Sequence, residues 1–153
     1  MATKMTNKDS CAHLCKGTHG FYLKANRDIS RGQVVFFLDG EEIDQPNQHS
    51  IQIDEHLHYQ HAESLWRFTQ HACNPTLRFD TQKKAMIAIC DIKPNEELTY
   101  NYNSSEWSMS VPFQCHCHAN NCVGEIKGFA YLSQTEREQL RPLLTTYLLS
   151  YLE

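Results

Sequence analysis

Residues 67–76 read RFTQHACNPT, and this stretch decides how the rest of the chain is interpreted. At its start, the spacing of Leu65, Trp66 and Phe68 predicts one or two helical turns. The asparagine–proline pair should end those turns, because a residue that precedes proline disfavours the helical conformation. Taken alone, His71 is more typical of a hydrogen-bonded structural histidine than of a ligand contact. The segments on either side of the stretch change that interpretation.

A dense cysteine pattern, Cys115-x-Cys117-x4-Cys122, follows within the polar residues 113–124 (FQCHCHANNCVG). Three thiolates in eight residues suit a tetrahedral zinc ion, which needs one more ligand. A structural zinc contributes roughly 10–16 kcal/mol of apparent binding free energy, enough to order a segment without an apolar core. The spacing leaves the fourth ligand open among two nearby histidines and two distant cysteines, which are His116, His118, Cys73 and Cys90.

The chain has 153 residues, of which 41% are apolar and 21% charged, as expected for one globular domain. Its seven cysteines cannot all pair with one another, and the first ten residues (MATKMTNKDS) lack the apolar core of a signal peptide. We therefore expect a reducing, intracellular location, cytoplasmic or nuclear, and no secretion. No stretch has the ~20 apolar residues that cross a bilayer, so no membrane association is expected.

The formal net charge is −4, from 14 basic and 18 acidic residues. Such a balance disfavours direct binding of nucleic acid and favours basic partners. Four acidic residues gather in one short stretch, at Asp39, Glu41, Glu42 and Asp44. This stretch is typical either of a solvated loop or of a surface that binds a basic peptide.

Six short runs rich in β-branched and aromatic residues predict a mostly β fold, at residues 21–25, 33–38, 50–53, 76–79, 85–90 and 97–102. Cys11 and Cys15 precede these runs, and we expect them to be free thiols in a mobile N-terminus. Cys90, within an apolar run, is expected to be a small core residue.

The spacing of apolar residues becomes helical near the C-terminus. Seven of them fall on one helical stripe: Leu140, Leu143, Leu144, Tyr147, Leu148, Tyr151 and Leu152. Ser133 and Glu136 fit a capping box, and Pro142 should kink the helix or divide it. The stripe is expected to pack on the β domain of a monomer, with a dimer contact as the alternative.

Residues 67–76 resemble the R-F-x-N-H-S-C-x-P-N signature of SET-domain lysine methyltransferases, with matches at Arg67, Phe68, His71, Cys73 and Pro75. Residues 26–34 (NRDISRGQV) resemble the family's R-D-I-x-x-G-x-x-I segment. Residues 89–102 (ICDIKPNEELTYNY) resemble R-D-I-x-x-G-E-E-L-x-[FY]-D-Y, and residues 115–124 resemble the post-SET C-x-C-x4-C-x-G motif. The similarity runs in register from about residue 17 to residue 129.

The resemblance implies a SET-domain fold of the β-clip type, mostly β with short helices. Its small sheets form a pseudoknot in which the chain near Tyr102 passes under the loop that carries His71. A post-SET zinc tail and a C-terminal amphipathic helix would follow. The implied division is an N-terminal extension at 1–16, the SET domain at 17–110, the post-SET zinc-binding segment at 111–129 and a C-terminal helical extension at 130–153.

The same resemblance implies methylation of lysine side chains in a protein, with S-adenosylmethionine as the methyl donor. Tyr102 falls at the final tyrosine of its segment, whose hydroxyl orients the amine, and is the expected catalytic residue. Tyr100 falls where relatives carry phenylalanine or tyrosine, and a tyrosine there favours mono- to dimethylation. The substrate expected is a lysine-containing basic protein or peptide, such as a histone tail.

The expected cofactor contacts follow from the same alignment. Gly20 and Phe21 stand in the family's G-x-G position, Gln70 and His71 stand in its N-H position, and His116 would border the adenine. The fourth ligand of one structural Zn²⁺ is implied to be Cys73, which joins Cys115, Cys117 and Cys122.

Three positions depart from the family pattern. Tyr22 stands at the second glycine, Gln70 replaces an asparagine and Thr76 replaces the last asparagine. Tyr22 and Gln70 motivate one alternative, a catalytically weak, zinc-stabilised interaction module. A further alternative is a methyltransferase that acts on a small amine or another non-histone substrate.

Overall fold

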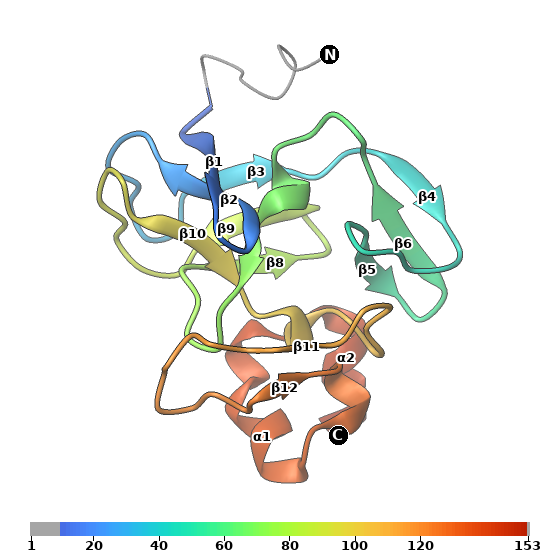
Figure 1. The fold of residues 1–153 in the computed structure, drawn as a ribbon. Coiled ribbons are helices and arrows are strands. Elements are labelled where there is room, and N and C mark those ends of the chain that lie inside the picture. The colour runs from blue at the N-terminus through green and yellow to red at the C-terminus, as the bar shows by residue number, and fades with distance from the viewer. Residues whose placement is uncertain (1–9, 153) are drawn as a thin grey trace.

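The computed structural model describes residues 10–152, and its short strands form four small sheets (Figure 1). The strands are β1 (Ala12–Gly17), β2 (Gly20–Ala25), β3 (Val34–Phe37), β4 (Glu41–Ile43), β5 (Ile51–Asp54), β6 (Leu57–Gln60), β7 (Gln70–His71), β8 (Leu77–Asp80), β9 (Ala85–Ala88), β10 (Glu97–Tyr100), β11 (Phe113–Gln114) and β12 (Glu125–Ile126). The mostly β fold is thus confirmed. Each of the six predicted runs forms a strand, with bounds that differ by one or two residues.

The helical segments are short, and most are single 3-10 turns. They are η2 (Trp66–Phe68), η3 (Tyr102–Ser104), η4 (Phe129–Tyr131), α1 (Gln134–Gln139), η5 (Arg141–Leu143), α2 (Thr146–Leu149) and η6 (Ser150–Leu152). The turn η2 confirms the helical prediction for the residues that lead into the stretch at 67–76.

One sheet, in the order β1-β2-β10-β7, brings distant parts of the chain together. The strand β10 pairs antiparallel with β2 on one side and parallel with β7 on the other. In the parallel pair, Thr99 lies opposite Gln70 and Tyr100 lies opposite His71. This register places the predicted catalytic strand directly beside the stretch that carries the family signature.

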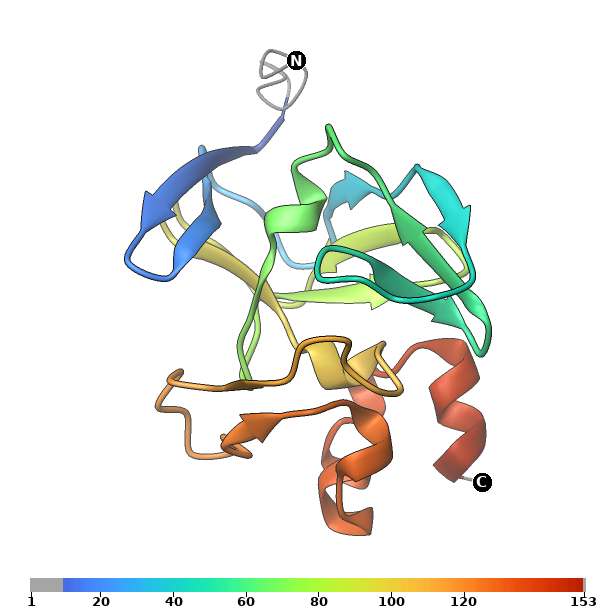
Figure 2. The ribbon, with the colours of Figure 1, turned by 45° about the vertical axis from the view of Figure 1, so that its right-hand side comes forward.

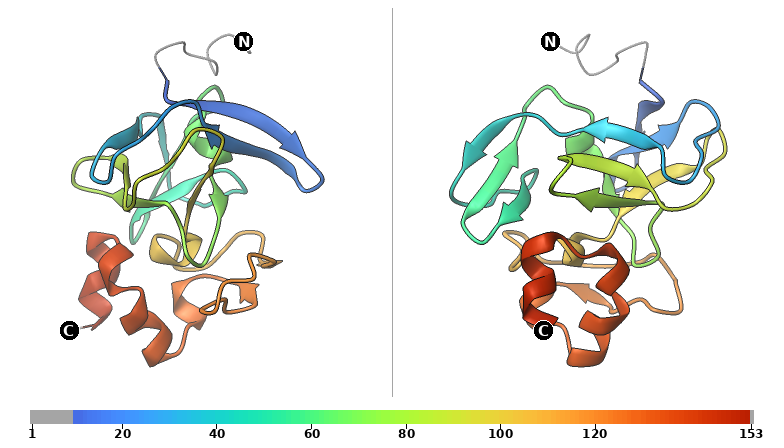
Figure 3. Two further views of the ribbon diagram at one scale, coloured as in Figure 1. Left: turned by 90° about the vertical axis from the view of Figure 1, so that its left-hand side faces the viewer. Right: turned by 180° about the vertical axis from the view of Figure 1, so that it is seen from behind.

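The remaining sheets surround this centre. They have the orders β3-β9-β8, β4-β6-β5 and β11-β12. In Figures 1 and 2 the N-terminal hairpin and the C-terminal helices lie at opposite ends of the molecule, and the β4-β6-β5 sheet stands to one side. The view from behind in Figure 3 shows α1 and α2 below β8 and β9.

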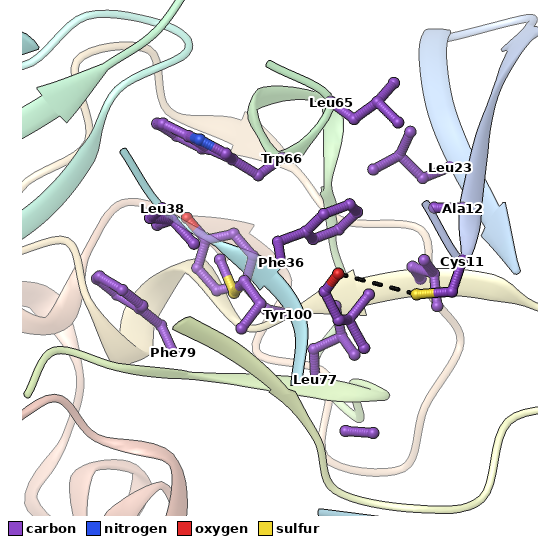
Figure 4. Close-up of a cluster of buried hydrophobic side chains, with 14 of the residues drawn as sticks. Cys11, Ala12, Leu23, Phe36, Leu38, Leu65, Trp66, Leu77, Phe79 and Tyr100 are labelled. Carbon is purple, nitrogen blue, oxygen red and sulfur yellow. Dashed lines mark hydrogen bonds between the residues drawn. The ribbon is translucent and has the colours of Figure 1, made fainter. Parts of the chain in front are cut away.

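The main core lies between the sheets and is made of apolar side chains from strands and from η2. Leu23, Leu77 and Phe79 are almost completely buried in it. Figure 4 shows these side chains with Trp66 and Tyr100, which extend the same cluster toward the predicted active site. Tyr100, which the sequence analysis places in the active site, is therefore also a core residue.

The N-terminal expectation is wrong from residue 11 onward. Cys11 is buried, its Sγ lies 3.8 Å from the carbonyl oxygen of Val35, and β1 pairs with β2 along its whole length. Both Cys11 and Cys15 are free thiols, as expected, but Cys15 lies within an ordered strand. Residues 1–9 of the expected extension lie outside the described residues.

The C-terminal segment forms the predicted capping box, in which Ser133 caps the backbone of Glu136 and the Glu136 side chain returns the bond. The amphipathic helix is divided, as the sequence analysis allowed for Pro142: α1 ends at Gln139, and Pro142 stands in the 3-10 turn that follows. Proline lacks the N–H that would continue the helix, which explains the break.

The apolar stripe packs within the chain, around the completely buried side chains of Phe129 and Leu148. Gly128 turns the chain into this region, with a φ of +118°. A side chain at this position would place its Cβ 2.5 Å from the carbonyl oxygen of Trp107, so only glycine fits without movement. The C-terminal helices therefore belong to the same folded unit as the sheets.

Within residues 10–152, no helix has both the length and the apolar character needed to cross a bilayer.

The packing of α2 predicts a large effect for Leu148→Ala. Because the Leu148 side chain is completely buried, its truncation should lower the free energy of unfolding by about 2–5 kcal/mol. Urea denaturation of this variant and of Leu149→Ala, whose side chain is only partly buried, provides the measurement. Equal effects of the two substitutions would contradict the docking of α2.

Candidate active site and metal centre

The structure brings together the four cysteines that the sequence analysis proposes as zinc ligands. The Sγ atoms of Cys73, Cys115, Cys117 and Cys122 all lie within 4.8 Å of one another, and those of Cys73 and Cys115 are 4.0 Å apart. A tetrahedral zinc ion with Zn–S bonds of about 2.3 Å requires Sγ separations of about 3.8 Å. The cluster therefore fits one zinc ion. Cys11, Cys15 and Cys90 lie outside it.

The electrostatics of the four thiols also favour a cation. Burial raises the pKa of Cys115 to about 11 and raises that of Cys73 further. Burial acts the same way on Cys117, but backbone hydrogen bonds at Ala119 and Cys73 outweigh it and lower the Cys117 pKa to about 6. A divalent cation would neutralise the crowded thiolates, which is why metal binding to such a group releases protons.

The polypeptide around the cysteines is fixed by hydrogen bonds. The side-chain amides of Asn101 and Asn121 both donate to the carbonyl oxygen of Cys73, over 3.4 and 3.0 Å. The Cys115 backbone N–H donates to the carbonyl of Gly124 over 2.7 Å, and β11 pairs with β12 on either side of the cysteine loop. Two segments far apart in the chain are thus held at the separation that a shared ion requires.

His71 lies between the cysteine cluster and Tyr102. The Tyr102 backbone N–H donates to Nδ1 of His71 over 3.0 Å, so the ring proton belongs on Nε2. Nε2 lies 3.4 Å from Sγ of Cys73 and can donate to it. Burial lowers the pKa of His71 to about 4, which keeps the ring neutral at pH 7.

Tyr102 differs from its prediction in backbone conformation. The predicted strand ends at Tyr100, because the Asn101 side chain accepts from the N–H of Asn103 and begins the turn η3. Tyr102 is the first residue of this turn, and its ring centroid lies 4.8 Å from that of Tyr100. We call Tyr100 and Tyr102 the pocket tyrosines.

The pocket tyrosines border a narrow pocket of about 30 Å³, which we call the tyrosine pocket. Its exposed rim is formed by Asn47, Gln48, His49 and Ser110, and its buried end by Trp66, Met86, Tyr100 and Glu106. The space is sufficient for about two water molecules, or for the terminal atoms of a slender unbranched side chain. A bulky group would not reach the buried end.

Within this pocket, the Tyr102 hydroxyl donates to the carbonyl oxygen of Thr69 over 2.7 Å. Burial, together with the Glu106 carboxylate, raises the pKa of Tyr102 well above its ordinary value, so the phenol stays neutral. Because its single proton is used by Thr69, the hydroxyl oxygen offers lone pairs to any other group that it contacts.

The sequence analysis missed Glu106. This residue is 5% exposed, and its Oε2 accepts from the backbone N–H of Gln52 over 2.8 Å and from the Ser105 hydroxyl over 2.7 Å. Burial raises the pKa of Glu106 to about 7 despite both hydrogen bonds. The available signal was a carboxylate directly before Trp107 and four residues after Tyr102, but nothing in the spacing indicates that it is buried.

The residues expected to contact the cofactor lie around the β1–β2 hairpin. The Gln70 side-chain amide donates to the carbonyl oxygen of Phe21 over 2.7 Å, which joins the two expected pairs. His116 stacks against His19 of the hairpin turn, with ring centroids 6.4 Å apart. Gly20 has a φ of +107° and open space where a side chain would stand, so a ligand can approach its backbone.

Tyr22 does not block this region. Successive side chains of a strand point to opposite faces, so the Tyr22 ring lies against Gly17 while the Phe21 ring lies 5.4 Å from that of Phe68. Tyr22 replaces the family glycine, but its ring lies on the face of β2 opposite to Phe21.

The fold and site together define a β protein of small sheets, with a narrow tyrosine-lined pocket beside a four-cysteine centre. A model of the SET domain matches residues 20–103. The chain therefore belongs to the SET-domain family.

Two curated relatives and one solved structure show the range of the similarity. A histone-lysine N-methyltransferase, H3 lysine-36 specific, from Chaetomium globosum is 30% identical over 149 residues, which cover 82% of this chain and 16% of the relative. Methyltransferase flvH from Aspergillus flavus is 38% identical over 63 residues, 40% of this chain and 35% of the relative. The chain thus spans about a sixth of the first relative and about a third of the second.

The structure of KRYPTONITE in complex with mCHH DNA, H3(1-15) peptide and SAH has a TM-score of 0.62 and 21% identity to this chain. The similarity covers 74% of this chain and 29% of the KRYPTONITE chain. The similarity confirms the SET fold that the sequence predicts.

The cysteine cluster predicts a zinc content of about one ion per chain. Cys73→Ser should lose most of this zinc and unfold at a lower temperature, because a serine hydroxyl is a poor zinc ligand. Metal analysis after dialysis, together with thermal unfolding, provides the measurement. Cys90→Ser is the matched control, and a full zinc content in Cys73→Ser would contradict the ligand set.

Glu106 predicts a pH dependence of stability. Its pKa is about 7 in the folded chain against an ordinary value of 4.5, so the folded state binds the proton more tightly. The stabilisation is complete below pH 4.5 and is lost as the pH rises to 7, a change of about 3 kcal/mol. Relative to Glu106→Gln, the wild-type free energy of unfolding should therefore fall between pH 4.5 and 7. If the free energy of unfolding, measured by urea denaturation, changes with pH in the same way in both proteins, the raised pKa of Glu106 is excluded.

Proposed function

We propose that this SET domain transfers a methyl group from S-adenosylmethionine to a lysine side chain of a protein. The tyrosine pocket carries the proposal. A lysine side chain is an unbranched chain of methylenes with a small amine at its end, which suits a narrow pocket of about 30 Å³. At the buried end, the pocket tyrosines would contact the amine.

Bound S-adenosylmethionine supplies a methyl group on a positively charged sulfur. The amine must be neutral to react, and a free lysine has a pKa of about 10.4. Desolvation in the pocket lowers that pKa. The Tyr102 hydroxyl, held by Thr69, can accept a hydrogen bond from the amine and so direct its lone pair. The contribution of the protein is then mainly proximity and orientation.

We assign the cofactor to the surface beside the β1–β2 hairpin, with contacts from Gly20, Phe21, Gln70, His71 and His116. The open space at Gly20 and the partly exposed Phe21 ring support this assignment. The SAH in the KRYPTONITE complex supports the choice of cofactor.

We assign one structural Zn²⁺ to the four-cysteine cluster. Its role would be to hold the segment at 111–129 against the loop of Cys73. The contact of His71 with both Cys73 and Tyr102 means that the zinc ion would also position the active site.

The proposed substrate is a lysine in a basic protein or peptide of the histone kind. The specificity of one relative for H3 lysine-36 and the H3 peptide in the KRYPTONITE complex support this class. The acidic residues Asp39, Glu41, Glu42 and Asp44 are all exposed, so they are available to a basic peptide. We place the reaction inside the cell, in the nucleus or cytoplasm, in a monomeric protein.

A second candidate, a catalytically weak interaction module, is favoured by one observation. The Gln70 amide is already engaged with the carbonyl oxygen of Phe21, so one of its donors is not available to a cofactor. An assay of methyl transfer from labelled S-adenosylmethionine separates the candidates, because the module would transfer no label even when it binds the cofactor.

Methyl transfer should depend on Tyr102. With labelled S-adenosylmethionine and a lysine-containing peptide, Tyr102→Phe should reduce transfer by about 10²-fold, since the amine loses the group that orients it. Cofactor binding should be unchanged. Tyr131→Phe, which alters an exposed tyrosine, is the matched control. Absence of transfer by the wild type, despite cofactor binding, would support the interaction module.

The product should depend on Tyr100. Wild-type enzyme should form mainly monomethyl-lysine, with some dimethyl-lysine, because the Tyr100 hydroxyl occupies room at the buried end of the pocket. Tyr100→Phe should shift the products toward higher methylation, as read by intact mass of the peptide. Mainly trimethyl-lysine from the wild type would contradict the assignment.

A further inference from the structure

Glu106 lies at the buried end of the tyrosine pocket. It stands two residues after the end of η3, and its carboxylate is the charge that acts most strongly on both pocket tyrosines and on Tyr147. The pocket therefore has an acidic group beside the two phenols that the proposed reaction uses. The zinc and cofactor assignments make no use of this group.

The carboxylate has no cationic partner in the described structure. Among residues 10–152, no ion pair within 4.0 Å involves Glu106. Both of its recorded hydrogen bonds reach Oε2, from Gln52 and Ser105. Burying a carboxylate without a counter-charge is costly, so a cationic group that enters the pocket would stabilise the ionised form of Glu106.

A second observation points to a polar occupant of the same pocket. The side chain of Trp66 is 4% exposed and lines the buried end, and its Nε1 donor has no hydrogen-bond partner within residues 10–152. An apolar occupant would leave this donor unpaired. A water molecule at the buried end would satisfy it, whereas an ammonium group, which only donates hydrogen bonds, would not.

We propose that Glu106 receives the ammonium group of the substrate lysine in the tyrosine pocket and takes its proton before methyl transfer. This inference rests on the proposed function and names the proton acceptor for it. Lysine is almost entirely protonated at pH 7, so it enters as a cation and a carboxylate is its natural counter-charge. Once the amine has displaced water, both groups favour their neutral forms.

The proposed step balances in atoms and charge. One N–H bond of the ammonium breaks and its electron pair stays on nitrogen, while an O–H bond forms on the carboxylate. The neutral amine then forms the N–C bond as the C–S bond of the donor breaks. Glu106 returns its proton to water when the pocket opens, so each cycle releases one proton.

The raised pKa of Glu106, about 7, supports this role because the group changes its protonation near neutral pH. The other titratable groups that face it are phenols: the pocket tyrosines from β10 and η3, and Tyr147 from α2, whose pKa values burial raises far above 7. His49 and Arg67 line the same pocket, and burial with the Arg67 charge lowers the pKa of His49.

A purely structural role for Glu106 makes a different prediction. The Glu106 carboxylate accepts from the N–H of Gln52, and the Gln52 side chain accepts from the N–H of Trp107 over 2.9 Å, so the pair links β5 to the segment after η3. A glutamine at position 106 retains an oxygen that can accept both hydrogen bonds of Oε2. The hydrogen bonds that link β5 to the segment after η3 would therefore remain in Glu106→Gln, whereas the proton acceptor would be lost.

The first test compares kcat and KM of wild type, Glu106→Gln and Glu138→Gln from pH 6 to 9 with a lysine-containing peptide. Glu138 is exposed in α1 and pairs with Arg141, so its variant controls for the loss of one charge. Glu106→Gln should lose about 10²-fold in kcat at pH 7 and should lose the rise in rate near pH 7. Unchanged kcat and an unchanged pH profile in a folded variant would overturn the proposal.

The second test needs no turnover. Calorimetry measures binding of the lysine peptide and of its norleucine counterpart, which lacks only the amine, to wild type and Glu106→Gln. Wild type should bind the lysine peptide at least tenfold more tightly than the norleucine peptide, and Glu106→Gln should lose this preference. An equal preference in both proteins would overturn the proposal. If wild type shows the preference but transfers no label, the proposed methyl transfer is contradicted, whereas the proposed amine site at Glu106 is supported.

Discussion

The hydrogen bond from the Tyr102 backbone N–H to Nδ1 of His71 is the interaction on which the site depends. It joins residues 31 apart in the chain, and it forms because β10 pairs in parallel with β7. Through its other nitrogen the same imidazole reaches Sγ of Cys73. His71 therefore links the tyrosine pocket to the cysteine cluster, and a shift of β7 along β10 would displace both at once.

The buried end of the pocket is supported from behind by the C-terminal region. The Thr145 backbone N–H donates to the carbonyl of Ser104, and the Tyr147 hydroxyl donates to the carbonyl of Ser105. These contacts reach the segment that carries Glu106, so α2 contributes to the placement of a carboxylate that it does not itself contain. A buried acid without a counter-charge lowers stability at neutral pH, which is the compromise expected at a functional site.

Much of the fold was predictable because the strongest strands are apolar runs between turn signals, and because four motifs stand in the order of one family. The strands that were missed have weaker signals. In β1, cysteine, histidine and lysine alternate with apolar residues, and β4 is short and acidic. The strand predicted through Tyr102 ended two residues early because the Asn101 side chain competes for the backbone of Asn103.

By itself, the sequence determined the family resemblance, the four cysteines and the two tyrosines, because fixed spacings of chemically distinctive residues survive without knowledge of distant contacts. Only the tertiary structure decided that Tyr22 points away from Phe21 and that Glu106 is buried beside the pocket tyrosines. The physical reason is that burial and proximity arise from pairing between remote segments. The sequence alone does not show whether the carboxylate of a glutamate is exposed to water or buried at the end of a pocket.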